Sequence, residues 1–206
     1  RELAINMRIE KNKFEIISSG ERPVNKKWVG KNWACHIASK QNNSSWILFI
    51  DADVILKEEA LELALNYATR NNTDLLSIAP RINCNCIAEW LVQPIMCILL
   101  GAAFPISKIN DRFNRKAFAA GPFMLFKNDT YTAIGGHQTV ANEVVEDIAL
   151  SKIIKQSGYN LKFLLGTNYI ELNMYSDLKS LFEGWSKNLF IGLERNILKT
   201  LGLSLI

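Results

Sequence analysis

Apolar residues in this chain fall into short continuous runs and into stripes with helical spacing. The run Trp46–Ile50 has the length of a strand and ends directly on Asp51-Ala52-Asp53, as expected of a central parallel strand covered on both faces. Residues 57–70 show the spacing of a helix, and residues 74–78 form the next strand-like run. This order predicts a right-handed βαβ unit with the carboxylates at its ligand-binding edge.

The rest of the chain continues the alternation of strands and helices. Gly121-Pro122 interrupts one strand-like run, and Gly135-Gly136 closes a short helix. We expect an α/β fold with a mixed sheet and acidic groups at the strand ends. The predicted strands are 14–18, 117–126 and 161–165, and the predicted helices are 33–40, 129–134, 146–156 and 178–193.

One apolar segment suggests contact with a bilayer. Residues 90–107 contain no charge but include Gln93 and two prolines, so the segment is close to the minimum for a spanning helix and is interrupted. A helix lying in the membrane interface is favoured over a buried core helix, because the basic residues Lys108, Arg112, Arg115 and Lys116 follow at once. Residues 200–206 are also apolar and fit either a frayed helix end or the first turns of a membrane helix.

Composition limits the possible functions. The 206 residues, with 49% apolar and 21% charged side chains and no linker or repeat, indicate one globular domain. A net charge of +4 is too small and too scattered for a nucleic-acid surface, but it is compatible with an anionic surface or a phosphorylated substrate. Four cysteines without metal-ligand spacing favour reduced thiols in a cytosolic compartment over a zinc site. The opening residues Arg1-Glu2-Leu3 show neither a basic n-region nor an apolar h-region, so they are not expected to be part of a secretory signal.

Asp51 and Asp53 are candidate metal ligands. They are separated by one small residue at the end of a buried strand, so both carboxylates can face one pocket. Two hard oxygen ligands without neighbouring Cys or His suit Mg²⁺ or Mn²⁺, which usually completes its shell with phosphate oxygens and water. The alternative is a turn that caps the helix beginning near Lys57.

Glu146 and Asp147 form a second acidic pair, at the predicted start of a helix. Carboxylates are stabilised there by the helix dipole, so a purely structural role is a real alternative. A carboxylate within hydrogen-bond reach of an acceptor hydroxyl can act as a general base, and Asp147 is the candidate.

The collinear motifs resemble those of family 2 glycosyltransferases, especially the bacterial branch that acts on hopanoid, carotenoid or other lipid acceptors. They are Trp28-Val29-Gly30-Lys31, Asp51-Ala52-Asp53, Gly121-Pro122-Phe123, Gly135-Gly136-His137, Glu146-Asp147 and Gly184-Trp185-Ser186-Lys187-Asn188. The resemblance implies a GT-A fold with a mixed, mostly parallel sheet flanked by helices, a nucleotide-sugar donor, a divalent metal and inversion at the anomeric carbon. The family's first strands find no match here, so we expect residues 1–195 to form a partial GT-A domain, with a membrane segment starting in 196–206.

Roles for individual residues follow from the same resemblance. Asp53 corresponds to the main metal ligand, Asp51 to a carboxylate on the donor ribose or sugar side, and Lys31 to a lysine near the diphosphate. Asp147 corresponds to the catalytic base, with Glu146 organising the acceptor pocket. Gly121 and Phe123 correspond to the loop between donor and acceptor, and Trp185 and Lys187 to a substrate-binding motif. That motif lacks the Gln-x-x-Arg-Trp pattern of processive synthases, so transfer of a single sugar is expected.

The expected function is sugar transfer to a hydroxyl of a lipid-like acceptor, on a membrane-associated protein whose catalytic domain is cytoplasmic. Two alternatives remain open from the sequence. One is a nucleotidyltransferase, which also combines an α/β sheet with Asp residues and Mg²⁺. The other is a membrane-associated domain without catalytic activity.

Overall fold

The computed structural model describes residues 15–175 and 177–192, with side chains through residue 186. Its centre is a mixed sheet with the strand order β1-β5-β3-β6. Strand β5 is antiparallel to both β1 and β3, whereas β6 is parallel to β3. Three of the four strands therefore run in one direction, but two of the three pairings are antiparallel, so the sheet is mixed and the expectation of a mostly parallel sheet is wrong. The four strands are β1 (Trp46–Ile50), β3 (Leu75–Ala79), β5 (Phe123–Lys127) and β6 (Leu161–Leu165).

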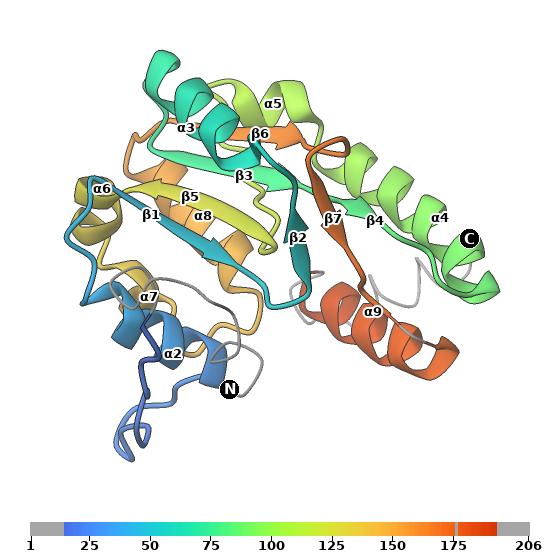
Figure 1. Cartoon of the computed structure of the whole chain (residues 1–206), viewed down its shortest axis with the longest axis horizontal. Coiled ribbons are helices and arrows are strands. Elements are labelled where there is room, and N and C mark those ends of the chain that lie inside the picture. The colour runs from blue at the N-terminus through green and yellow to red at the C-terminus, as the bar shows by residue number, and fades with distance from the viewer. Residues whose placement is uncertain (1–14, 176, 193–206) are drawn as a thin grey trace.

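A second, smaller sheet continues the first one. Its order is β2-β7-β4, formed by β2 (Val54–Leu56), β7 (Ile170–Leu172) and β4 (Arg81–Ile82). Each of its strands directly follows a strand of the central sheet along the chain, and Asp51, Ala52 and Asp53 form the link from β1 to β2 (Figure 1). The three short strands were not predicted, because runs of two or three residues are too short to show a period.

Side chains of the central sheet alternate between two apolar layers. Phe123 and Leu125 of β5 face a layer that includes Ala64 and Ala68 of helix α3 (Ala60–Arg70). Met124 and Phe126 face the opposite layer, which includes side chains of three other helices. Those helices are α5 (Ile106–Asn110), α6 (Asn128–Ala133) and α8 (Glu146–Gln156). Because β-strand side chains alternate between the two faces, one five-residue strand contributes to both layers.

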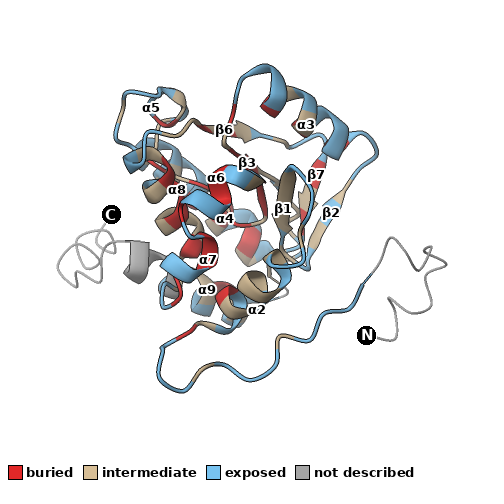
Figure 2. Cartoon of the chain, turned by 90° about the vertical axis from the view of Figure 1, so that its left-hand side faces the viewer, coloured by how far each residue is buried: buried red, intermediate tan, exposed pale blue. Residues whose placement is uncertain are grey.

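Three strand predictions need correction. Strand β1 is covered on both faces, but within the described residues it pairs only with β5, so it lies at an edge and its residues are half-buried or exposed. A continuous apolar run predicts that both faces of a strand are covered, but it does not predict where the strand lies in the order of the sheet. Residues 15–18 form no strand and lie on an exposed N-terminal segment (Figure 2). The run 117–126 becomes a strand only at Phe123, after Pro122, which has no N–H to donate.

The helices largely match their predicted positions. Helix α8 (Glu146–Gln156) has the predicted bounds, and α2 (Gly30–Ser39) starts three residues before the predicted one. The remaining helices are the short α7 (Gly136–Thr139), the apolar α4 (Ile87–Ala103) and α9 (Leu178–Gly192). Residues 196–206, the predicted start of a membrane segment, lie outside the described part of the chain.

Candidate active site

Four segments that are distant in sequence meet at one end of β1. Lys31 lies in the first turn of α2, and Asp51 directly follows β1. Gly121 precedes β5, whereas Glu146 and Asp147 form the first turn of α8. The structure thus brings together five of the residues that the sequence indicated.

Lys31 joins two of these segments through ion pairs. Its Nζ lies 2.7 Å from Oδ1 of Asp51 and 2.7 Å from Oε1 of Glu146. Glu146 is nearly buried, with 7% of its side chain exposed, so its charge depends on this lysine for compensation. Burial alone would lower the pKa of Lys31, but the attraction of Glu146 and Asp51 outweighs it and raises the pKa. Lys31 therefore stays protonated throughout the physiological range.

Asp147 points in a different direction from Glu146. Its Oδ2 accepts a hydrogen bond from the backbone N–H of Gly121 at 2.9 Å, and its Oδ1 accepts one from the N–H of Ile148 at 2.8 Å. Burial and the neighbouring charge of Glu146 raise the pKa of Asp147 to about 6, although both hydrogen bonds and Lys31 act in the opposite sense. The bond to Ile148 satisfies an N–H group in the first turn of α8, so Asp147 also stabilises the start of this helix.

Gly121 permits the close approach of these groups. A Cβ atom at this position would lie 3.1 Å from Oδ2 of Asp147 and 3.5 Å from Nζ of Lys31. The first of these distances is tighter than ordinary van der Waals contact, so the carboxylate would have to shift. The sequence identified Gly121 by its motif, and the structure supplies the physical reason.

Two buried polar side chains hold the segments in place and were missed by the sequence analysis. Asn32 is fully buried and donates from Nδ2 to the carbonyls of Val140 and Glu143, at 2.7 and 2.8 Å, which ties α2 to the loop before α8. Ser77 of β3 accepts a hydrogen bond from the N–H of Ala120 at 2.8 Å. Ser77 is a single polar residue in an apolar run, which is a signal that the sequence offers, whereas Asn32 has no such signal. The partner of neither residue can be known from sequence.

The proposed metal ligands lie in the turn between β1 and β2. Asp51 forms an ion pair with Lys31, whereas the Asp53 side chain is exposed and makes no ion pair or hydrogen bond with any described residue. Residues 15–175 and 177–192 contain no group of three or more His, Cys, Asp or Glu side chains that could hold a metal by themselves. Two carboxylates without sulfur or imidazole nonetheless fit a hard cation that takes its other ligands from phosphate and water.

Two other predicted site residues, Phe123 and Trp185, lie away from these carboxylates, and a third, Lys187, has a side chain that the structure does not describe. Phe123 was expected on a loop beside the substrates, but it begins β5 and is fully buried in the core beneath α3, so it supports the site from behind. Trp185 of α9 donates from its indole N–H to Oε1 of Gln93 on α4 at 3.2 Å. Within the described residues, Trp185 makes no hydrogen bond or ion pair with Lys31, Asp51, Glu146 or Asp147. Lys187 belongs to α9, and its side chain lies outside the described part.

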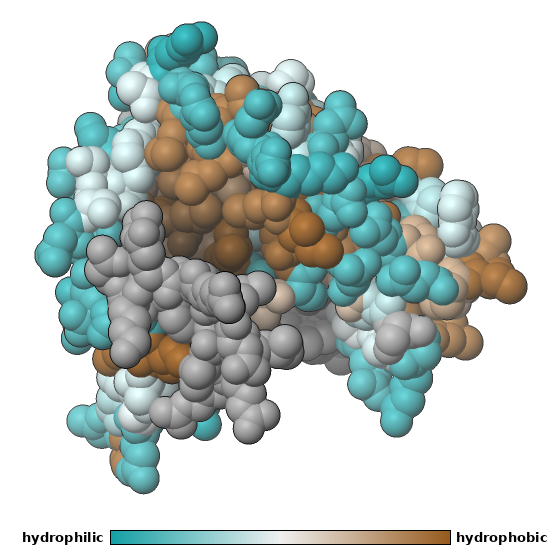
Figure 3. All heavy atoms as spheres, in the orientation of Figure 1, coloured by the Kyte–Doolittle hydropathy of each residue, from teal (hydrophilic) through white to brown (hydrophobic). Residues whose placement is uncertain are grey.

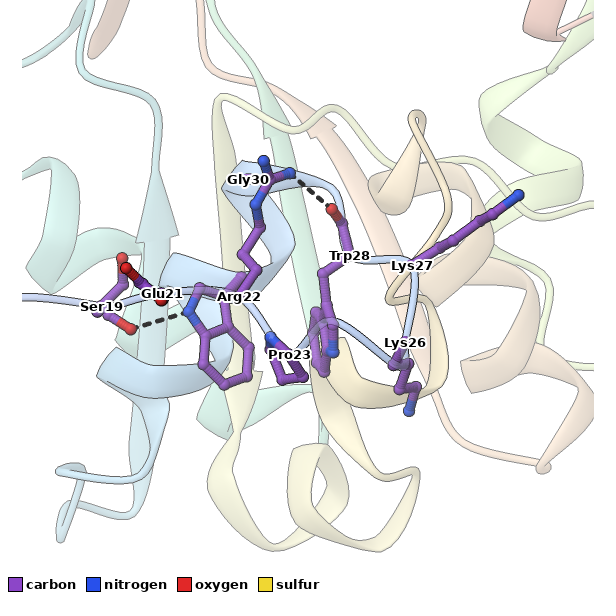
Figure 4. A pocket seen from close by; sticks show the side chains of 10 residues that line it. Ser19, Glu21, Arg22, Pro23, Lys26, Lys27, Trp28 and Gly30 are labelled. Carbon is purple, nitrogen blue, oxygen red and sulfur yellow. Dashed lines mark hydrogen bonds between the residues drawn. The ribbon is translucent and has the colours of Figure 1, made fainter.

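A cavity of about 780 Å³ lies against the start of α2. Its lining includes the indoles of Trp28 and Trp33, which meet edge to face with ring centroids 5.0 Å apart. Arg22 donates to the carbonyl of Trp28, and Trp33 donates to that of Ser19 (Figure 4). Glu21, Lys26 and Lys27 also line the cavity. The ammonium of Lys26 lies over the Trp28 ring, 5.3 Å from its centroid, in a cation–π contact.

Comparison with known proteins identifies the family of this chain. Residues 22–135 match the profile described as glycosyl transferase family 2, and the chain belongs to this family. Its relatives include 4,4'-diaponeurosporenoate glycosyltransferases of Staphylococcus haemolyticus (strain JCSC1435), 27% identical over 80% of this chain, and Staphylococcus aureus (strain USA300), 29% identical over 81%. The chain spans 44% and 45% of these relatives, less than half of their length.

Among solved structures, S. aureus TarS in complex with UDP-GlcNAc aligns with a TM-score of 0.41 and 12% identity over 71% of this chain and 39% of that one. Mannosyl-3-phosphoglycerate synthase from Rubrobacter xylanophilus aligns with a TM-score of 0.38 and 14% identity, over 75% and 46%. The predicted family is confirmed by the family match, and the predicted α/β class by the mixed sheet and its flanking helices.

Proposed function

We propose that this chain is the catalytic domain of an inverting glycosyltransferase that transfers one sugar from a nucleotide-diphosphate donor to a lipid-like acceptor at a membrane surface. The observation that supports this most is the arrangement around Lys31. The ammonium group of Lys31 lies between the carboxylates of Asp51 and the buried Glu146. The carboxyl of Asp147 lies beside them, and its pKa is raised to about 6. Family membership supports the reaction class.

On the donor side, Asp51 and Asp53 would hold Mg²⁺ or Mn²⁺ against the diphosphate. The bound ion would neutralise charge on the leaving group. Lys31 is close enough to Asp51 to add a second positive charge there. Since Lys31 stays protonated, it can stabilise the nucleoside diphosphate as it leaves, without a proton transfer.

On the acceptor side, Asp147 would act as the general base. The acceptor oxygen attacks the anomeric carbon, the bond from that carbon to the diphosphate oxygen breaks, and the hydroxyl proton moves to Asp147. A base with a pKa near 6 is ionised at neutral pH and is stronger than an ordinary aspartate. One displacement inverts the anomeric carbon and needs no covalent enzyme intermediate.

The acceptor has two candidate chemistries. The relatives are named for diaponeurosporenoate, and this name denotes a carboxylate. A carboxylate is already ionised at neutral pH and needs no base. The raised pKa of Asp147 favours a hydroxyl for this chain, because only a hydroxyl must lose a proton during transfer.

The proposal is tested with labelled nucleotide sugars, Mn²⁺, a long-chain alcohol and a long-chain carboxylic acid. We expect transfer to the alcohol that falls by about 10²- to 10⁴-fold in Asp147→Asn. Asp129→Asn is the matched control, since Asp129 lies in the first turn of α6 and is exposed. Transfer only to the acid, unaffected by Asp147→Asn, would identify a carboxylate acceptor. Release of pyrophosphate would indicate a nucleotidyltransferase, and no turnover a domain without catalytic activity.

A further inference from the structure

Helix α4 (Ile87–Ala103) has its polar and apolar faces reversed with respect to water. Glu89 is fully buried and Gln93 is 3% exposed, and both face the protein together with Met96. The outward side chains are apolar and highly exposed: Ile87 (80%), Trp90 (70%), Leu91 (67%), Ile95 (58%) and Ile98 (71%). A helix on the surface of a soluble domain normally has the opposite arrangement.

The buried polar residues have partners inside the protein. Oε2 of Glu89 accepts a hydrogen bond from the N–H of Asn85 at 2.7 Å. Gln93 accepts the indole N–H of Trp185 on α9 and contacts the sulfur of Met174. The orientation of α4 is therefore fixed by specific contacts, and the outward apolar face is a consequence of these contacts.

The apolar surface extends beyond α4. Leu178 and Phe182 of α9 are 64% and 70% exposed, and α9 packs against α4 through Trp185. Hydrophobic residues gather at the α4 edge of the molecule (Figure 3). Glu89 is the sole charged residue of α4, so the exposed face of this helix contains no charge. Contiguous exposed apolar surface of this kind marks an interaction site.

We infer that the outward face of α4 docks in the interface of an anionic lipid bilayer. The basic residues Lys108, Arg112, Arg115 and Lys116 follow α4 and are exposed, and they surround Phe113, which is 95% exposed. Lys116 reaches back to the helix end, where its Nζ donates to the carbonyl of Ala103 at 2.8 Å. Cations beside an apolar face complement a negatively charged membrane surface. A protein partner would be expected to meet several hydrogen-bonding groups, whereas the outward side chains of α4 named above offer only the indole N–H of Trp90.

The dimensions of α4 indicate that it lies in the plane of the membrane. Its 17 residues span about 25 Å, which is shorter than a hydrocarbon core of about 30 Å, and Pro94 interrupts its middle. None of the helices in the described residues is long and apolar enough to cross a bilayer. The exposed fractions also exclude the alternative that residues 90–107 form a buried core helix.

The test is vesicle flotation of the 206-residue chain with phosphatidylcholine alone and with added phosphatidylglycerol. Leu91→Glu/Ile98→Glu should reduce the partition coefficient by at least about tenfold, because each removes an apolar side chain from the bilayer. The matched control is Leu61→Glu/Leu63→Glu, which adds the same charge to exposed positions of α3 (44% and 43%) and should lose much less binding. Thermal melts establish that each variant is folded.

Charge is tested separately. Lys108→Gln/Arg115→Gln should weaken binding to phosphatidylglycerol vesicles and reduce its salt dependence, whereas Lys40→Gln/Arg70→Gln, remote in sequence from α4, should have a smaller effect. Equal binding by the α4 and α3 variants would overturn the inference. So would a lipid-free dimer, measured by light scattering, that the α4 variant dissociates while vesicle binding is retained. None of these outcomes depends on sugar transfer, so they are independent of the proposed activity.

Discussion

At the scale of single residues, Asp147 is held by opposing influences. Burial and Glu146 favour its protonated form, while two backbone N–H groups and Lys31 favour its ionised form. The pKa that results, about 6, lies above the ordinary value of 3.8. The protonated form of Asp147 therefore favours the folded state. Its contribution to the free energy of unfolding is fully present below pH 3.8 and is lost as the pH rises through about 6.

The pH dependence of catalysis should report this carboxyl. Because the base must be ionised, kcat/KM for a hydroxyl acceptor should rise about tenfold per pH unit below pH 6 and level off above it. A pH series with parent and Asp129→Asn should give the same profile. An apparent pKa near 4 would show that Asp147 is solvated like an ordinary aspartate during turnover and would contradict the assignment.

Lys31 affects two carboxylates at once. Lys31→Met leaves the buried Glu146 without its ion-pair partner. It should lower the free energy of unfolding by roughly 1 to 2 kcal/mol, less than for a fully buried pair because the Lys31 side chain is 44% exposed. Adding Glu146→Gln removes the uncompensated charge and should restore part of the loss, which denaturant melts of the two single variants and the double variant can measure. Strictly additive losses would mean that the two side chains do not interact in solution.

The site residues were predictable to the extent that they lie in short motifs. Asp51, Glu146 and Asp147 could be located because each stands beside a strand end or a helix start that the sequence shows, whereas Lys31 was indicated only by the resemblance to the family. Asn32 could not, because its function depends on carbonyls more than 100 residues away, at Val140 and Glu143. Phe123 was misplaced because its motif spans the boundary between loop and strand.

At the scale of elements, the approach of β5 to α8 determines the geometry of the site. Gly121 lies two residues before the start of β5, and its N–H reaches the first turn of α8. Helix α8 was predicted with its observed bounds because its apolar spacing begins at an acidic first turn and ends before Gly158. The edge position of β1 could not be predicted, since pairing in a sheet depends on residues far apart in sequence.

Gly121→Ala should separate packing from chemistry. The new methyl group would lie 3.1 Å from Oδ2 of Asp147, so the carboxylate must move, and we expect a loss of about 10- to 100-fold in kcat with a small change in melting temperature. Gly30→Ala is the matched control, because a Cβ at Gly30 meets nothing within 4 Å. Equal activity of the two variants would show that the carboxylate adapts without cost.

At the scale of the whole molecule, the link between the two sheets coincides with the proposed metal site. Asp51 and Asp53 lie where the chain passes from β1 to β2, so the proposed ligands are anchored by strands on both sides. Ligands held in this way should couple donor binding to the stability of both sheets. The coupling can be measured without any assay of turnover.

A nucleoside diphosphate with Mn²⁺ should raise the melting temperature of the chain. At a ligand concentration of about 100 Kd the expected stabilisation is about 2.7 kcal/mol. A chelator should remove it, and Asp53→Asn should abolish the metal-dependent part because a neutral amide holds the cation less well. Asp129→Asn, remote from the turn, should respond like the parent. If the metal-dependent rise in melting temperature persists in Asp53→Asn, Asp53 is not a metal ligand and the turn between β1 and β2 has only a structural role.

The hydrogen bond from Gly121 to Asp147 has a consequence for mutational scanning. Its donor is a backbone N–H, and the next residue, Pro122, has none. Among the natural residues only proline deletes this donor, and it also adds a ring and fixes φ, so a saturation library at position 121 cannot separate the bond from crowding. Replacing the amide by an ester, with glycolic acid in place of Gly121, deletes the N–H while adding no bulk, and semisynthesis is therefore the route to its separate contribution.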